Sequence, residues 1–71
     1  MSNQKTIRTL KKLHNICKAG ERGFNIVAHA VSNRGLKVML KSYARQRCQM
    51  ADELKAMVES LGGELSKRRS L

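Results

Sequence analysis

The side chains of this chain that could do chemistry are few, and their spacing suits packing better than catalysis. The 71 residues include five acids, two histidines and two cysteines. A di-iron site in a helical bundle needs a Glu three residues before a His, because that spacing projects both ligands from one helical face. Neither His14 nor His29 has a carboxylate three residues before it. We therefore expect no metal site and no cofactor, and metal-dependent oxidation is kept only as an alternative.

Other catalytic arrangements are also missing from the sequence. It contains no glycine-rich phosphate loop, no zinc-type spacing and no pairing of a nucleophile with a base. Cys17 and Cys48 are too few for a disulfide scaffold, so we expect two reduced thiols, with Cys17 in the core. Tyr43 is expected to fill the core as well. These observations favour a protein that is not an enzyme.

One charged residue, Arg47, stands within an otherwise apolar stripe. If the chain turns near residues 33–34, positions whose numbers sum to about 67–68 lie side by side in an antiparallel hairpin. We therefore predict an ion pair between Glu21 and Arg47, within or between chains, that fixes the register of the helices. The alternative is that Arg47 extends to the surface and pairs with nothing. The same arithmetic places His14 near Glu53, as a structural hydrogen bond.

Two helices must position these side chains. Apolar residues recur at alternating steps of three and four, which is the period of one helix face. The first stripe is Leu10, Leu13, Cys17, Gly20, Phe24, Val27 and Val31, and the second is Leu36, Leu40, Tyr43, Arg47, Met50, Leu54, Met57 and Leu61. We expect helices at about 5–32 and 34–61 within one domain, residues 1–65, followed by a basic tail at 66–71.

The ends of these helices are marked in the sequence. Ser32 or Asn33 is a suitable N-cap for the second helix, and Gly62-Gly63 is a suitable stop. A connection this short makes the two helices antiparallel neighbours, so the fold class is an all-α hairpin. Gly20 and Gly23 indicate either close approach by a neighbouring helix or a local kink.

Two helices can bury one stripe each but little more. A domain of this size supplies only about 3–5 kcal/mol from a single core. Ala44, Ala51 and Val58 flank the second stripe and widen its apolar face beyond a narrow seam. We therefore predict that two copies dimerise into a four-helix bundle.

Three segments of the chain resemble a known family. Leu10 to Phe24 is similar to its leucine-rich opening, Ala44 to Leu54 to its Ala/Arg-rich second helix, and Leu61 to Glu64 to its Leu-Gly-Gly ending. Over about residues 6–65 the chain thus resembles the first helical hairpin of a bacterial ferritin-like four-helix-bundle family of unknown function. The resemblance implies a ferritin-like bundle whose second hairpin comes from another chain. The chain departs from the family in having Ala19 where an Asp is usual, and in being more basic.

The formal net charge of +10 points to an anionic partner. Most of the basic residues fall on the outer faces of the predicted helices, where acids barely intersperse. The predicted anion-binding surface consists of Lys11, Lys12, Lys18, Arg22, Arg34, Lys41, Arg45, Lys67, Arg68 and Arg69. Nucleic acid or an acidic protein surface would suit it.

The sequence has neither a signal-peptide hydrophobic region nor an apolar run long enough to span a membrane, so we expect a cytoplasmic protein. The function these features favour is a small basic hairpin that dimerises and binds an anionic partner. The alternatives are a ferritin-like metal protein with a degenerate site and a structural subunit of a larger complex.

Overall fold

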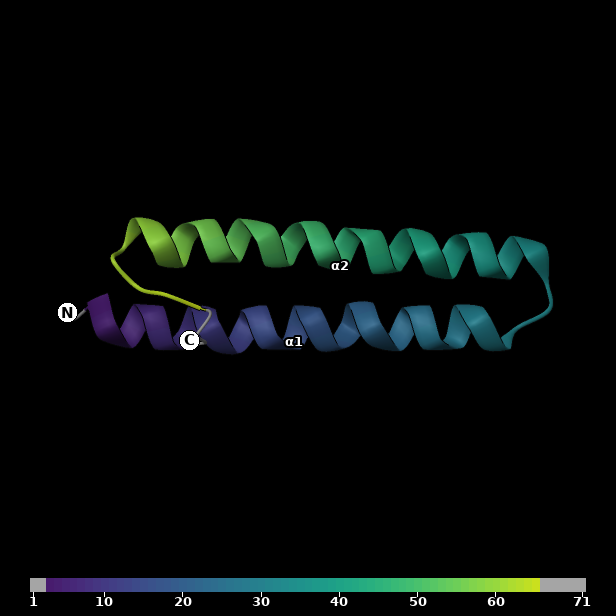
Figure 1. Ribbon diagram of the computed structural model, residues 1–71, viewed down its shortest axis with the longest axis horizontal. Coiled ribbons are helices and arrows are strands. Elements are labelled where there is room, and N and C mark those ends of the chain that lie inside the picture. Colours follow the sequence, from purple (N-terminus) through teal and green to yellow (C-terminus); the bar gives the residue numbers. More distant parts are fainter. Residues whose placement is uncertain (1–2, 66–71) are drawn as a thin grey trace, which may run out of the picture.

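Two long helices joined by a short loop form the structure. The computed structural model describes residues 3–65. Helix α1 spans Asn3–Ala30 and helix α2 spans Arg34–Ser60, and they lie antiparallel and side by side along their whole length (Figure 1). The all-α hairpin predicted from the sequence is confirmed. The basic tail predicted at 66–71 lies outside the described residues.

The loop between the helices ends at an N-cap. Asn33 has extended backbone angles (φ −67°, ψ 120°), and its side-chain oxygen accepts a hydrogen bond of 2.8 Å from the backbone N–H of Leu36. That bond satisfies one of the N–H groups that a helix start leaves without a partner. Of the two residues predicted as caps, Ser32 and Asn33, the structure therefore selects Asn33.

The predicted glycine stop ends α2 through a Schellman motif. The N–H of Gly63 donates to the carbonyl of Val58 (2.9 Å), and the N–H of Gly62 donates to the carbonyl of Glu59 (3.0 Å). Gly62 has φ +91°, a backbone conformation that costs little only for glycine. Gly63 then lies against α1: a Cβ there would come within 2.9 Å of methyl carbons of both Ile7 and Val58.

Replacing Gly62 with Ala is expected to lower the free energy of unfolding by about 1–2 kcal/mol, because an L side chain is strained at positive φ. Thermal unfolding followed by circular dichroism measures the change. Gly62→Asn is the matched control, since asparagine tolerates the left-handed region better and should lose less stability. Equal stability of the Ala variant and the wild type would contradict this assignment of the cap.

The contact between the two helices is built largely from small side chains. Its buried residues are Cys17 and Ala28 on α1, and Ala44, Ala51, Leu54 and Val58 on α2. Cys17 packs with Ala51, Leu54 and the partly buried Leu10, and its predicted burial is confirmed. Three alanines in so short a set let the helix axes approach closely. They also bury little apolar area per residue.

The two predicted apolar stripes therefore form only part of the buried contact between the helices, which we call the seam of the hairpin. Large residues of both stripes are exposed, including Leu13 and Val27 on α1 and Tyr43, Met50 and Met57 on α2. The seam on α2 is shifted toward Ala44, Ala51 and Val58, which were predicted only to flank the stripe. The physical reason is size: the hairpin closes over its smallest side chains, and the larger ones beside them are left on an adjoining face.

Candidate functional site

The hairpin has two broad faces of opposite character. Helical spacing places most of the large exposed apolar residues of both helices on the same side of the hairpin plane. Ile26 and Val38 are the exceptions, and Ile26 lines a shallow groove together with Arg22 and His29. We call this side the apolar face; it comprises Leu13, Ile16 and Val27 on α1, and Leu36, Met39, Tyr43, Met50 and Met57 on α2. The rings of Phe24 and Tyr43 lie 5.4 Å apart between the helices at its centre. The hairpin is only 14 Å deep in its thinnest direction, and no other element within residues 3–65 covers the apolar face.

Arg47 projects toward the same face as Tyr43 and Met50. A Cβ built on Gly20 would lie 3.6 Å from both Cγ and Cδ of Arg47, so the aliphatic part of the arginine packs over the backbone of that glycine. At that distance an added Cβ would make ordinary van der Waals contact, so the position would also accept alanine. A Cβ on Gly23, in contrast, would meet no side chain and no backbone of the other helix within 4 Å. Within the hairpin, therefore, neither glycine is required by a close approach of the other helix.

Glu21 is held by a neighbour on its own helix. Its Oε1 lies 2.9 Å from Nζ of Lys18, a pair spaced i, i+3. This contact lowers the pKa of the Glu21 carboxyl and raises the pKa of the Lys18 ammonium. Within residues 3–65 it is the only ion pair, so the predicted pairing of Glu21 with Arg47 does not form inside one chain. Pairing between two chains stays a prediction.

The opposite side of the hairpin is polar and carries a shallow groove. The groove has a volume of about 260 Å³ and is lined by Glu21, Asn25 and His29 on α1, and by Lys41, Ala44, Arg45 and Cys48 on α2. We call it the polar groove. The charge of Glu21 raises the pKa of the Cys48 thiol, which makes the thiolate less available. Both cysteines are free thiols.

His14 does not have the predicted partner. Its Nδ1 is buried without a hydrogen bond, and the exposed Glu53 makes no side-chain bond within residues 3–65. The same rotation of α2 that exposes the predicted stripe turns Glu53 away from α1, so the hydrogen bond expected between these two residues is wrong. In the described part of the chain, no three His, Cys, Asp or Glu side chains come together as a metal site would require.

The predicted basic surface divides into two regions. Arg22, Arg34, Lys41 and Arg45 lie in the half of the hairpin next to the loop, whereas Lys11 and Lys12 lie near the chain ends, where Asp52 and Glu59 belong to the adjacent turns of α2. Lys18 stands between the two regions and is paired with Glu21. Lys67, Arg68 and Arg69 lie outside the described residues.

Two further residues belong to this surface that were not predicted from the sequence. Lys37 continues the steps of three and four that join Arg34, Lys41 and Arg45 along one face of α2, and His29 lines the polar groove beside them. The sequence does contain a signal that could have identified them as part of a basic surface, because no Asp or Glu occurs between Glu21 and Asp52.

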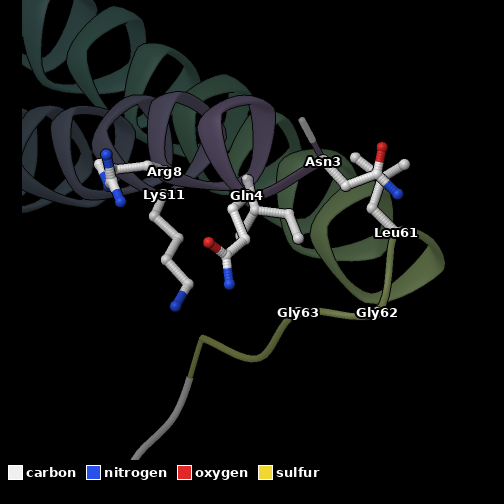
Figure 2. Close-up of a pocket in the computed structure, with 8 residues that line it drawn as sticks. Asn3, Gln4, Arg8, Lys11, Leu61, Gly62 and Gly63 are labelled. Atoms are coloured by element: carbon white, nitrogen blue, oxygen red, sulfur yellow. The ribbon is translucent and has the colours of Figure 1, made fainter. Parts of the chain in front are cut away.

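A second groove lies at the open end of the hairpin, where the segment after α2 returns over α1 (Figure 2). It has a volume of about 490 Å³ and is lined by Asn3, Gln4, Ile7, Arg8, Lys11, Leu61, Gly62 and Gly63. The N–H groups of both glycines are already bonded to carbonyls of α2, so they are not free to hold an anion. Of its lining residues, only Lys11 had been predicted as part of the basic surface.

Comparison with known proteins places the chain in a family but gives it no activity. No helix within residues 3–65 is long and apolar enough to cross a membrane. No curated protein and no solved structure matches the chain. One family model does match, over residues 5–71, and its description is "Domain of unknown function (DUF2383)". The expected membership of a family of unknown function is thereby confirmed: the chain belongs to the DUF2383 family.

Proposed function

We propose that this chain is a small basic protein without enzymatic activity that dimerises through its apolar face and binds an anionic partner through its polar side. The observation that carries the proposal is the separation of the two faces. Most of the large exposed apolar side chains, apart from Ile26 and Val38, gather on one of them, while the polar groove and its cations occupy the other. Assembly can therefore cover the first face without blocking the second.

The apolar face is large enough for a stable dimer. The apolar face extends for about 32 Å along α2, from Leu36 to Met57, and two adjacent helices are about 20 Å wide. The resulting area of roughly 600 Å² on each copy, about 1,200 Å² in total, reaches the lower end of the range for specific protein interfaces. A second copy offers a face of the same size and apolar character. Pairing the two faces would complete a four-helix bundle, which we propose to be ferritin-like.

The need for a partner follows from the small core. Val58 is the one large side chain in residues 3–65 that is fully buried, and Met57, its neighbour, is 49% exposed. Burying the exposed methionines, Leu13, Ile16 and Tyr43 between two copies would add apolar contact that the single hairpin lacks. The dimer would then be the folded unit, with stability that depends on protein concentration.

The anionic partner is tested with purified chain and defined probes. We expect a labelled nucleic-acid oligomer to bind at 50 mM salt and to lose about 10³-fold or more in affinity by 200 mM, because counterion release drives such binding. Polyglutamate serves as the probe for an acidic protein surface. Light scattering during gel filtration gives the mass in the same buffers. A monomer at micromolar concentration would refute the dimer, and no binding to either polyanion at low salt would refute the anionic partner.

A further inference from the structure

We infer that the anionic partner is double-stranded nucleic acid, bound through its phosphate backbone by the half of the hairpin next to the loop. This inference rests on the proposed function and assigns the binding surface and the class of nucleic acid. We call this region the loop half: residues 22–46, which comprise the end of α1, the loop and the first part of α2 (Figure 1).

The loop half is basic and contains no acid. Residues 22–46 include five basic residues, Arg22, Arg34, Lys37, Lys41 and Arg45, and neither Asp nor Glu. The other 46 residues of the chain hold ten basic residues and all five acids. A polyanion at the loop half would therefore meet cations without a repelling carboxylate among them, whereas acids lie among the cations elsewhere in the sequence.

The cations of the loop half are free to meet phosphates. The nearest acid, Glu21, is paired with Lys18, and within residues 3–65 no carboxylate forms an ion pair with Arg22, Lys41 or Arg45. Lys41 and Arg45 line one side of the polar groove, while Asn25, His29 and the Lys18-paired Glu21 line the other. Exposed Arg and Lys heads with amide and imidazole donors between them are the groups that contact phosphate oxygens.

The positions of Arg34 and Lys37 are costly for folding. Both lie in the first turns of α2, where the helix dipole favours acids, and the first turn contains none. Residues that oppose a local folding preference without a compensating contact are typical of functional surfaces. From Arg34 to Arg45 the cations extend for about 17 Å along the helix. Duplex DNA presents a charge about every 1.7 Å of its axis, so this row faces several phosphates at once.

The chain lacks the means to bind single strands by stacking. Proteins that prefer single-stranded nucleic acid place exposed aromatic rings beneath the bases. Phe24 and Tyr43 are the only aromatic residues of this chain, and they contact one another between the helices, away from the polar groove. A rigid row of cations without a stacking platform suits the regular backbone of a duplex, and the binding should be independent of sequence.

The test compares two variants that each lose two positive charges. Lys41→Gln/Arg45→Gln removes exposed cations of the loop half, and Lys5→Gln/Lys12→Gln removes exposed cations near the chain ends. Fluorescence anisotropy measures the affinity for a labelled duplex of about 20 base pairs and for a single strand of the same length, between 50 and 200 mM salt. Circular dichroism of both variants checks that the helices are retained.

We expect the loop-half variant to lose roughly 50-fold in duplex affinity at 100 mM salt and its salt slope to fall by about two. The control variant should lose less than about 5-fold, and the single strand should bind the wild type more weakly than the duplex does. Equal losses in the two variants, or tighter binding of the single strand, would overturn this inference while leaving an anionic partner standing. Absence of wild-type binding to any polyanion would instead refute the proposed function itself. If the loop-half variant lost its helices, Arg34→Gln/Lys37→Gln would take its place, with the same expected loss.

Discussion

Replacing Met50 with Asp is expected to convert the dimer into monomers and to raise the dissociation constant by at least 100-fold. Met50 is 43% exposed in the single hairpin and lies near the middle of the apolar face. In the dimer its side chain would be covered by the second copy. A carboxylate at this place would have to lose its hydration without gaining a partner, a cost of several kcal/mol.

Gln49→Asp is the matched control for that experiment. Residue 49 is exposed, and helical spacing turns it outward, away from both α1 and the apolar face. It introduces the same charge one residue away and should leave the mass and the melting temperature almost unchanged. Gel filtration with light scattering and thermal melts at several protein concentrations measure both quantities. A Met50→Asp protein that kept the dimeric mass would exclude the apolar face as the interface.

The melting temperature of the Met50→Asp variant should also fall, because folding and association are coupled. The core of one hairpin consists largely of alanines, Cys17, Leu54 and Val58. Such a core offsets little of the conformational entropy that a chain of 71 residues loses on folding. In the wild type, the melting temperature should therefore rise with protein concentration, as expected when the folded unit contains two chains. It should not do so in the variant.

The hairpin itself could be predicted from the sequence because its signals are local. The apolar period, the N-cap at Asn33 and the Gly62-Gly63 stop each depend on a few neighbouring residues. The residues that form the seam, in contrast, depend on which of two neighbouring faces of α2 packs against α1. The stripe through Tyr43 and Met50 is the more hydrophobic, yet the neighbouring row through Ala44 and Ala51 allows closer packing of the helices.

The difference between local and non-local signals also explains which contacts of the candidate site could be predicted. The contact between Lys18 and Glu21 is readable from its i, i+3 spacing. The helix register correctly predicts that Glu21 and Arg47 lie at the same height along the hairpin. Whether they touch also depends on how α2 is rotated about its own axis, and the register does not determine that rotation. Arg47 does meet α1 at that height, but at Gly20, on the side of the hairpin away from the polar groove.

Replacing Arg47 with Leu is expected to strengthen the dimer, lowering its dissociation constant by about 10-fold or more. The stem of Arg47 already packs over Gly20, and a leucine can keep part of that contact. The guanidinium, in contrast, is directed toward an apolar face that carries no acid among its residues. A second copy that supplies no carboxylate would bury this charge without a partner, and apolar replacement of such a group commonly stabilises an assembly by about 1–4 kcal/mol.

Arg45→Leu is the matched control, because it removes the same charge two residues away from a side chain that lines the polar groove. It should leave the dissociation constant of the dimer within about 2-fold of the wild type, as measured by sedimentation at several concentrations. A weaker dimer in the Arg47→Leu protein would show that the second copy supplies a carboxylate to Arg47. Glu21→Gln would then be the decisive partner variant. A matching loss of dimer affinity in this variant, with no further loss when Glu21→Gln and Arg47→Leu are combined, would establish the inter-chain ion pair that the register predicted.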